Sequence, residues 1–204
     1  MRPLAGLLIA YLAGSIPFAF LAGKLFKGID LREHGSGNLG ATNVFRVMGW
    51  KIASLVMVLD MAKGALPVLL LPPRFAPANS ELWAIAFGIA AIIGHVRSIF
   101  LLWRGGGKGV ATAGGVFLAL APIASLISIA VFAIVVYLSG YVSLGSLCSA
   151  VALTVAVVLM KGVSSPITIA CAVITLFVFW THRTNISRLR RGEENRFRRA
   201  RPAT

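Results

Sequence analysis

The length of its apolar runs is the feature that most constrains what this chain can fold into. Residues 110–181 are apolar almost throughout, and shorter apolar runs cover residues 3–23, 52–71 and 82–102. A helix needs about 20 mostly apolar residues to cross a hydrocarbon core about 30 Å thick. With 58% hydrophobic and only 13% charged residues in 204, the chain has too little polar sequence to cover a water-soluble globule. The sequence therefore predicts an all-α polytopic membrane protein.

The long apolar run divides where Pro, Gly and polar residues interrupt it, at Pro122, at residues 140–145 and at residues 161–166. Four segments result, which predicts seven transmembrane helices in a single integral membrane domain over residues 1–204. Because the segment at residues 110–121 is short, a total of five or six spans remains open.

Basic residues set the expected orientation, since Lys and Arg are retained on the cytoplasmic side. With seven spans, fifteen Lys and Arg residues lie on one side and three on the other. We therefore expect the N-terminus outside and the C-terminus in the cytoplasm, with a basic cytoplasmic tail from about residue 182. This bias explains much of the net charge of +14, and the tail is better explained as an anchor at anionic headgroups than as an RNA-binding segment. The lipid bilayer is the expected partner, and nucleic acid is not.

The Cys and His residues indicate no disulfide, metal centre or cofactor. Cys148 and Cys171 fall inside predicted spans without CxxC spacing, and the three His residues are scattered along the chain. The first apolar run is long for a signal peptide and follows a single basic residue, so we treat it as a retained span.

The polar segment GSGNLGATN, residues 35–43, is unsuited to lipid and predicts an anion site. Gly35, Gly37 and Gly40 let backbone amides turn toward a common point, and a helix beginning near Ala41 adds its N-terminal amides. Short neutral donors are present at Ser36, Asn38, Thr42 and Asn43. Arg46, about one turn into the helix, can bind phosphate with two hydrogen bonds. The alternative is a flexible loop with a helix cap.

A second segment, GGGKGVAT at residues 105–112, shares Gly, Gly, Ala and Thr with the first at corresponding places. Lys108 replaces Asn38 and supplies a positive charge. The same cradle contains Gly106, Gly107, Gly109 and Thr112. A P-loop is excluded, because Lys108 is followed by Gly109 and the required upstream glycine is missing. We therefore predict two anion cradles, each leading into a helix, although so short a repeat also arises by coincidence.

Further polar residues lie near the ends of the predicted spans. His182 and Asn185 are three apart and would share a face of a helix leaving the last span. His182 can accept a proton from a hydroxyl near neutral pH, or it is an interfacial histidine satisfied by headgroups. Ser143 can donate to an anion or cap a helix.

Ionisable residues inside the predicted spans need partners, because an unpaired one at the bilayer centre costs at least about 2.5 kcal/mol. Asp60 and Lys63 are three apart, and we expect a structural ion pair rather than a substrate contact. His95 and Arg97 are expected to face the interior or the cytoplasmic rim.

Five motifs together resemble those of a known family: GSGNLGATNVFR, LDMAKGALP, GGKGVAT, YVSLGS and HRTNISRL, in this order and at these intervals. They are similar to the motifs of the bacterial acyl-phosphate:glycerol-3-phosphate acyltransferases, and the resemblance spans nearly the whole chain. It implies a seven-span enzyme of the bacterial cytoplasmic (inner) membrane, with its active site on the cytoplasmic face. Such an enzyme moves a fatty acyl group from acyl phosphate to the 1-hydroxyl of glycerol 3-phosphate, giving lysophosphatidic acid and phosphate. Acyltransferases that use acyl-CoA or acyl carrier protein carry an HxxxxD motif, which this sequence lacks.

The resemblance also implies which residues contact the substrates. They are Ser36, Asn38, Thr42, Asn43 and Arg46 in the first loop, Lys108 in the second, and Ser143, His182 and Asn185. Two departures affect the expected path of residues 96–107: three glycines precede Lys108 where two are expected, and Arg97 and Ser98 stand where the family usually has proline soon after the histidine.

Direct attack on acyl phosphate is the expected mechanism, because this mixed anhydride has a good leaving group and no Ser-His-Asp triad is visible. Lys108 and Arg46 would hold phosphate charge, and the loop amides would stabilise the oxyanion and the departing phosphate. Ser36 of the first loop is expected to be catalytic with them. His182 or a substrate phosphate oxygen would accept the proton. A membrane transporter of anions or phosphate esters, with binding groups near the midplane, and a non-catalytic scaffold are the alternatives. A monomer is compatible with the sequence.

Overall fold

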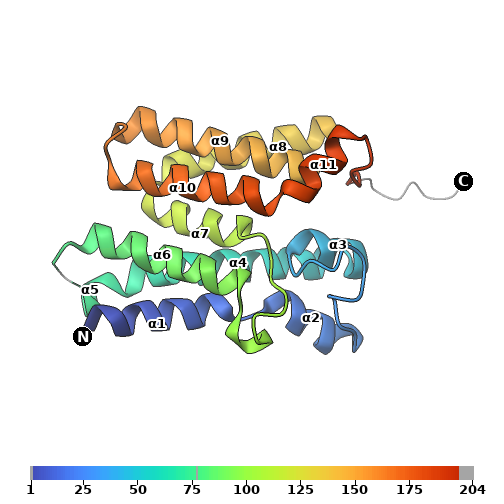
Figure 1. The fold of residues 1–204 in the computed structure, drawn as a ribbon, viewed down its shortest axis with the longest axis horizontal. Coiled ribbons are helices and arrows are strands. Elements are labelled where there is room, and N and C mark those ends of the chain that lie inside the picture. The colour runs from blue at the N-terminus through green and yellow to red at the C-terminus, as the bar shows by residue number, and fades with distance from the viewer. Residues whose placement is uncertain (1, 77, 198–204) are drawn as a thin grey trace, which may run out of the picture. The chain divides into compact units, whose positions relative to one another are not determined.

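A computed structural model describes residues 2–76 and 78–197, within which all regular secondary structure is helical. The chain forms two compact units that divide between Leu120 and Ala121. We call them unit 1 and unit 2. In Figure 1 unit 1 runs from blue to yellow-green, and unit 2 runs from yellow to red. The all-helical architecture predicted from the sequence is confirmed for the described residues.

The described residues of unit 1 form seven α-helices and one 3₁₀ turn. They are α1 (Arg2–Ser15), α2 (Phe18–Lys27), α3 (Ala41–Met48), α4 (Trp50–Leu70), α5 (Pro72–Phe75), α6 (Ser80–Val96), η1 (Ile99–Leu101) and α7 (Val110–Leu120). The first predicted span divides into α1 and α2 at Pro17, because proline lacks an N–H for the helix. The third ends at Val96 rather than at residue 102, and the chain then turns back through η1.

Helices of unit 1 pack at very short range through small residues. The main pairs are α1 with α6 and α4 with α7. A side chain added at Gly14 would collide with the Ala91 backbone of α6, and one at Gly115 would collide with the Met61 backbone of α4. Small residues let membrane helices approach to backbone contact, where van der Waals attraction replaces the missing hydrophobic drive.

Unit 2 contains α8 (Pro122–Ser139), α9 (Val142–Lys161), α10 (Pro166–Thr181) and α11 (Arg183–Arg190). α9 packs against both α8 and α10 (Figure 1). Hydrogen bonds join these apolar helices: Ser128 Oγ donates to Ser149 O at 2.8 Å, and the hydroxyls of Thr154 and Thr175 lie 2.8 Å apart. Helices α8 and α10 each begin with proline, whose fixed φ suits the first helical position.

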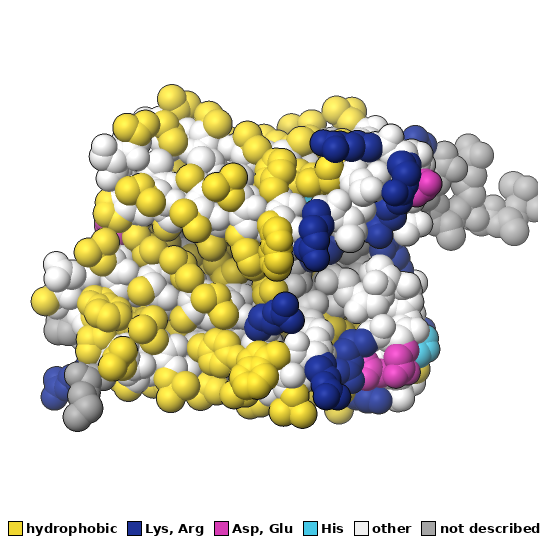
Figure 2. Space-filling view, in the orientation of Figure 1, with side chains coloured by type: hydrophobic (Ala, Val, Ile, Leu, Met, Phe, Trp, Pro, Cys, Tyr) yellow, Lys and Arg dark blue, Asp and Glu magenta, His cyan; other side chains and the backbone are white. Residues whose placement is uncertain are grey.

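Within residues 2–76 and 78–197, five helical stretches are long and apolar enough to cross a membrane, and the bent pair of α10 and α11 makes six. Helix α7, the segment that the sequence marked as short, has 11 residues and falls below that length. A multi-pass membrane protein is therefore confirmed, with five or six spans by length and composition. Figure 2 shows apolar side chains over the helical flanks of each unit and most Lys and Arg side chains gathered at one end of each unit.

Candidate active site

The first glycine loop, residues 35–43, is closed by the side chain of Asn43 at the start of α3. Asn43 is fully buried; its Oδ1 accepts from the Ser36 amide at 2.8 Å, and its Nδ2 donates to His34 O at 3.0 Å. Gly35 has φ +64 and lies against Asn43 Oδ1, so a side chain would be strained and would collide there. Asn43 therefore shapes the loop from within.

A helix begins at Ala41, as the sequence predicted, and brings its N-terminus to this loop. Gly40 is the N-cap, and its carbonyl accepts from the amides of Asn43 and Val44. Arg46 lies on α3 with its side chain exposed. The helix N-terminus, the loop and a guanidinium one turn later together form an arrangement suited to an anion.

The second glycine loop, residues 105–109, leads into α7 at Val110. It includes Lys108, whose side chain is partly buried. Thr112, in the first turn of α7, is fully buried, and no described residue hydrogen-bonds to its hydroxyl. Gly107 is buried and packs against His95 at the end of α6. The prediction that each loop leads into a helix is confirmed.

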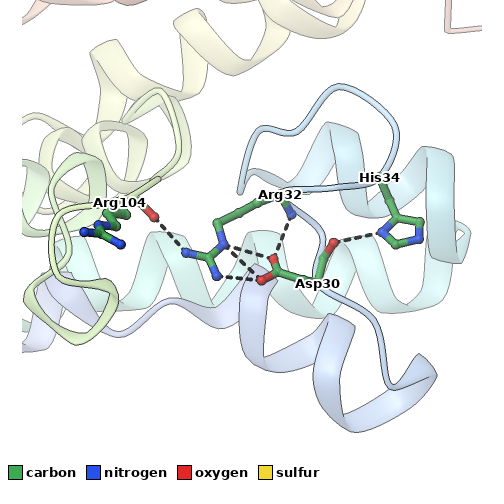
Figure 3. Close-up of polar contacts among 4 residues, drawn as sticks. All are labelled: Asp30, Arg32, His34 and Arg104. Carbon is green, nitrogen blue, oxygen red and sulfur yellow. Dashed lines mark hydrogen bonds and ion pairs between the residues drawn. The ribbon is translucent and has the colours of Figure 1, made fainter.

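The two glycine loops are joined to each other within unit 1. The Leu39 amide donates to Gly106 O at 3.4 Å, and the Gly107 amide donates to His95 O at 3.3 Å. Arg32, just before the first loop, donates from Nη1 to Arg104 O at 3.0 Å (Figure 3). Arg32 and Arg104 are 72 residues apart in the sequence, so this bond joins distant segments into one structure.

Asp30 holds Arg32 in this bridging position. The guanidinium donates to both carboxylate oxygens, with Nη2 to Oδ2 at 2.6 Å, while His34 Nδ1 lies 2.8 Å from Asp30 O (Figure 3). Hydrogen bonds from Arg32 lower the pKa of Asp30 to about 2. The carboxylate therefore stays charged at any pH near neutral, and Arg32 keeps its partner.

Two of the predicted polar residues of unit 2, Ser143 and Asn185, contact Glu194. Ser143 Oγ and Asn185 Nδ2 donate to Glu194 Oε1 at 2.8 and 2.6 Å, and Arg188 Nε donates to Oε2 at 2.7 Å. Burial raises the pKa of Glu194, but the hydrogen bonds from Arg188, Asn185 and Ser143 outweigh it, so the pKa is lowered. His182 is also buried, and its Nδ1 lies 2.9 Å from Val178 O, one turn back in α10.

The contacts of Glu194 are not predicted from the sequence, because the segment after α11 is interpreted there as a topology anchor. The signal was available: the chain has only six acidic residues, and two of them, Glu193 and Glu194, stand here within an Arg-rich run. A buried carboxylate among arginines indicates an internal ion pair rather than a purely solvated tail.

Unit 2 also contains an apolar groove of about 690 Å³ along α9. It is bordered by Leu144 near one end of α9 and by Met160 near the other, with α8 and Phe179 contributing to its walls. Such a groove can accommodate a hydrocarbon chain without leaving polar groups unpaired.

The sequence of this chain is similar to those of known membrane acyltransferases. The model of the glycerol-3-phosphate acyltransferase family matches residues 4–192. The glycerol-3-phosphate acyltransferase of Maridesulfovibrio salexigens is 46% identical over 189 residues, covering 93% of this chain and 94% of that protein. That of Geobacillus kaustophilus is 47% identical over 183 residues, covering 90% of each.

Two solved structures share the fold. One is PlsY, an integral membrane glycerol 3-phosphate acyltransferase, in its glycerol 3-phosphate form, with a TM-score of 0.88, 37% identity and coverage of 97% of this chain and 96% of that one. The other is the lysophosphatidic acid form, with a TM-score of 0.85 and 35% identity over 96% of this chain and 95% of that one. The chain belongs to the glycerol-3-phosphate acyltransferase family of integral membrane enzymes.

Proposed function

We propose that this acyltransferase takes its acyl group from acyl phosphate and transfers it to the 1-hydroxyl of glycerol 3-phosphate, releasing lysophosphatidic acid and phosphate. The joining of the two glycine loops by the Leu39–Gly106 and Arg32–Arg104 bonds is the observation that carries this proposal. Both substrates carry phosphate, so a site with two neighbouring anion cradles suits both at once. The names of the relatives fit the acceptor, glycerol 3-phosphate.

The first loop and Arg46 form one cradle, and the second loop and Lys108 form the other. Ser36, Asn38 and Thr42 contribute polar contacts, while Gly37, Gly40, Gly106 and Gly109 leave room for backbone amides to approach phosphate. Asn43 acts by keeping the first loop closed, since its amide already bonds Ser36 and His34. The hydroxyl attacks the acyl carbon directly, and Lys108 and Arg46 neutralise charge as phosphate departs.

His182 and Asn185 keep their predicted roles in this proposal. His182 orients or deprotonates the attacking hydroxyl unless a phosphate oxygen of the substrate accepts that proton. Asn185 donates to a substrate oxygen, with Glu194 fixing its side chain, whereas Ser143 gives its one hydroxyl hydrogen to Glu194 and acts through that carboxylate. The apolar groove along α9 accommodates the fatty chain of the donor.

The loops face the cytoplasm of a bacterial inner membrane in this proposal, with the C-terminus on the same side. The support is the excess of Lys and Arg on that side of the seven-span prediction. A single cysteine introduced at Gly105 should react with a membrane-impermeant reagent only from the inside. A single cysteine introduced at Ala78 should react only from the outside. Labelling of both from one side would contradict this orientation.

The donor is tested with purified protein in lipid vesicles. Labelled glycerol 3-phosphate is supplied with acyl phosphate, acyl-CoA or acylated carrier protein, and lysophosphatidic acid and free phosphate are measured. Equal amounts of both products from acyl phosphate alone are expected. Acyl-CoA as the only working donor would overturn the proposal, and substrate flux without acyl transfer would favour a transporter.

A further inference from the structure

A cluster of ionisable side chains lies inside unit 1, outside the glycine loops. Asp60 and Lys63 of α4 and His95 of α6 are 1%, 5% and 6% exposed. Lys63 Nζ lies 2.7 Å from Asp60 Oδ1, and His95 Nδ1 lies 3.6 Å from the same oxygen. The ion pair expected between Asp60 and Lys63 is thus present, with His95 as a third member.

Lys63 ties this cluster to the break between α1 and α2. Its Nζ donates to Ile16 O at 2.8 Å and lies 5.4 Å from the centre of the Phe18 ring. Ile16 O lies at the break beside Pro17, where it also accepts from the Phe18 amide at 3.1 Å. The cluster therefore connects α1, α4 and α6 at one level of the bundle.

Stability alone does not explain why this buried cluster contains charged residues. Burying two charges costs several kcal/mol for each, and well-packed apolar residues in their place are often as stabilising or more so. The best-attested benefit of a buried polar cluster is a fixed geometry.

His95 connects the cluster to the second glycine loop. While Nδ1 faces Asp60, Nε2 lies against Gly107, where an added side chain would collide with it. The same added side chain would lie 3.0 Å from Leu39 O, so Gly107 is held between the imidazole and the first loop. Gly107 directly precedes Lys108 in the chain.

We propose that Asp60, Lys63 and His95 are positioning residues that hold the second glycine loop, and with it Lys108, in the geometry for acyl transfer. Asp60 orients the His95 ring, Lys63 fixes Asp60, and the ring supports Gly107. The role of Lys108 in this inference rests on the proposed function. The cluster acts through the loop and does not contact the substrates.

The test combines His95→Ala with Lys108→Ala in a double-mutant cycle. Because misplacing a catalytic group by about 1 Å costs about 100-fold, we expect His95→Ala to lower kcat/KM by about 10-fold to 100-fold. In the Lys108→Ala background the same change should cost less than about threefold, since the loop then has no lysine to position. An equal loss in both backgrounds would overturn the inference.

Hydrogen exchange of residues 105–109 gives a readout that does not depend on Lys108. His95→Ala should speed exchange there, whereas Ser128→Ala, which removes a buried hydrogen bond in unit 2, should not. His95→Gln keeps a polar group able to reach Gly107 and should restore both slow exchange and most activity. Unchanged exchange in His95→Ala would contradict the inference. Normal turnover by Lys108→Ala alone would remove Lys108 from the proposed mechanism, and exchange would then decide the role of His95.

Discussion

At the scale of single residues, Glu194 illustrates how one carboxylate organises several functional side chains. Because it accepts from Ser143, Asn185 and Arg188, Glu194→Ala leaves three buried or partly buried donors without their acceptor. We expect a loss of about 2 kcal/mol in unfolding free energy and a large loss of activity, measured by thermal unfolding and turnover. Glu193→Ala is the matched control, since that exposed pair with Arg191 contributes little. Equal effects of the two variants would contradict the role assigned to Glu194.

Asp30 gives a pH-dependent prediction at the same scale. Its pKa falls from 3.8 to about 2 on folding, so its contribution to stability is fully present above about pH 4 and is lost as pH falls toward 2. Asp30→Asn should lower the unfolding temperature by an amount that is constant from pH 8 to pH 5 and shrinks by pH 3. A difference that grows on acidification would contradict the Arg32 pairing. The effect should stay within about 1 kcal/mol, because solvent reaches the Arg32 end of the pair and screens its charge.

At the scale of helices, glycine contacts decide how closely α7 packs on α4. A methyl group at Gly115 would collide with the Met61 carbonyl, whereas one at Gly114 meets nothing within 4 Å. Gly115→Ala should therefore lower the unfolding temperature and reduce activity, because α7 carries the second loop at its N-terminus. Gly114→Ala, with the same change in helix propensity, should be neutral or slightly stabilising. Equal unfolding temperatures of the two variants would contradict the close contact between Gly115 and Met61.

Helix α9 gives a prediction about acyl-chain length. Val151 lines the apolar groove midway along α9, and Val151→Trp would shorten the space for a hydrocarbon chain. We expect kcat/KM for a long-chain acyl phosphate to fall about tenfold relative to a short-chain one, since each buried CH₂ contributes about 0.8 kcal/mol. Ile169→Trp, on the exposed face of α10, serves as control. An equal loss with both donors would remove the groove from chain binding.

The helices could be predicted from the sequence because their signals are local. Apolar runs with Pro and Gly at their ends predicted α4, α8, α9 and α10 closely, and the glycine loop predicted a helix beginning near Ala41, which is α3. The break at Pro17 and the turn after Val96 were missed, since apolar residues continue past both positions. Contacts between distant segments were also missed: nothing local in Arg32 indicates Arg104, and nothing near Ser143 indicates Glu194.

At the scale of the whole molecule, the two glycine loops explain why a chain so apolar keeps two polar segments. Each loop leads into a helix, and hydrogen bonds join the two within unit 1. Arg46 and Lys108 therefore belong to one structure rather than to two separate loops. In the proposed function these charges hold phosphate, while Figure 2 shows apolar side chains over the helical flanks.

The most direct test of this account is the kcat/KM of purified Lys108→Ala with acyl phosphate and glycerol 3-phosphate. If Lys108 stabilises phosphate charge in the joined loops, its removal should lower kcat/KM about 100-fold or more. Lys51→Ala removes an exposed lysine of the same unit and should retain normal turnover. Near-normal turnover by Lys108→Ala would contradict the account.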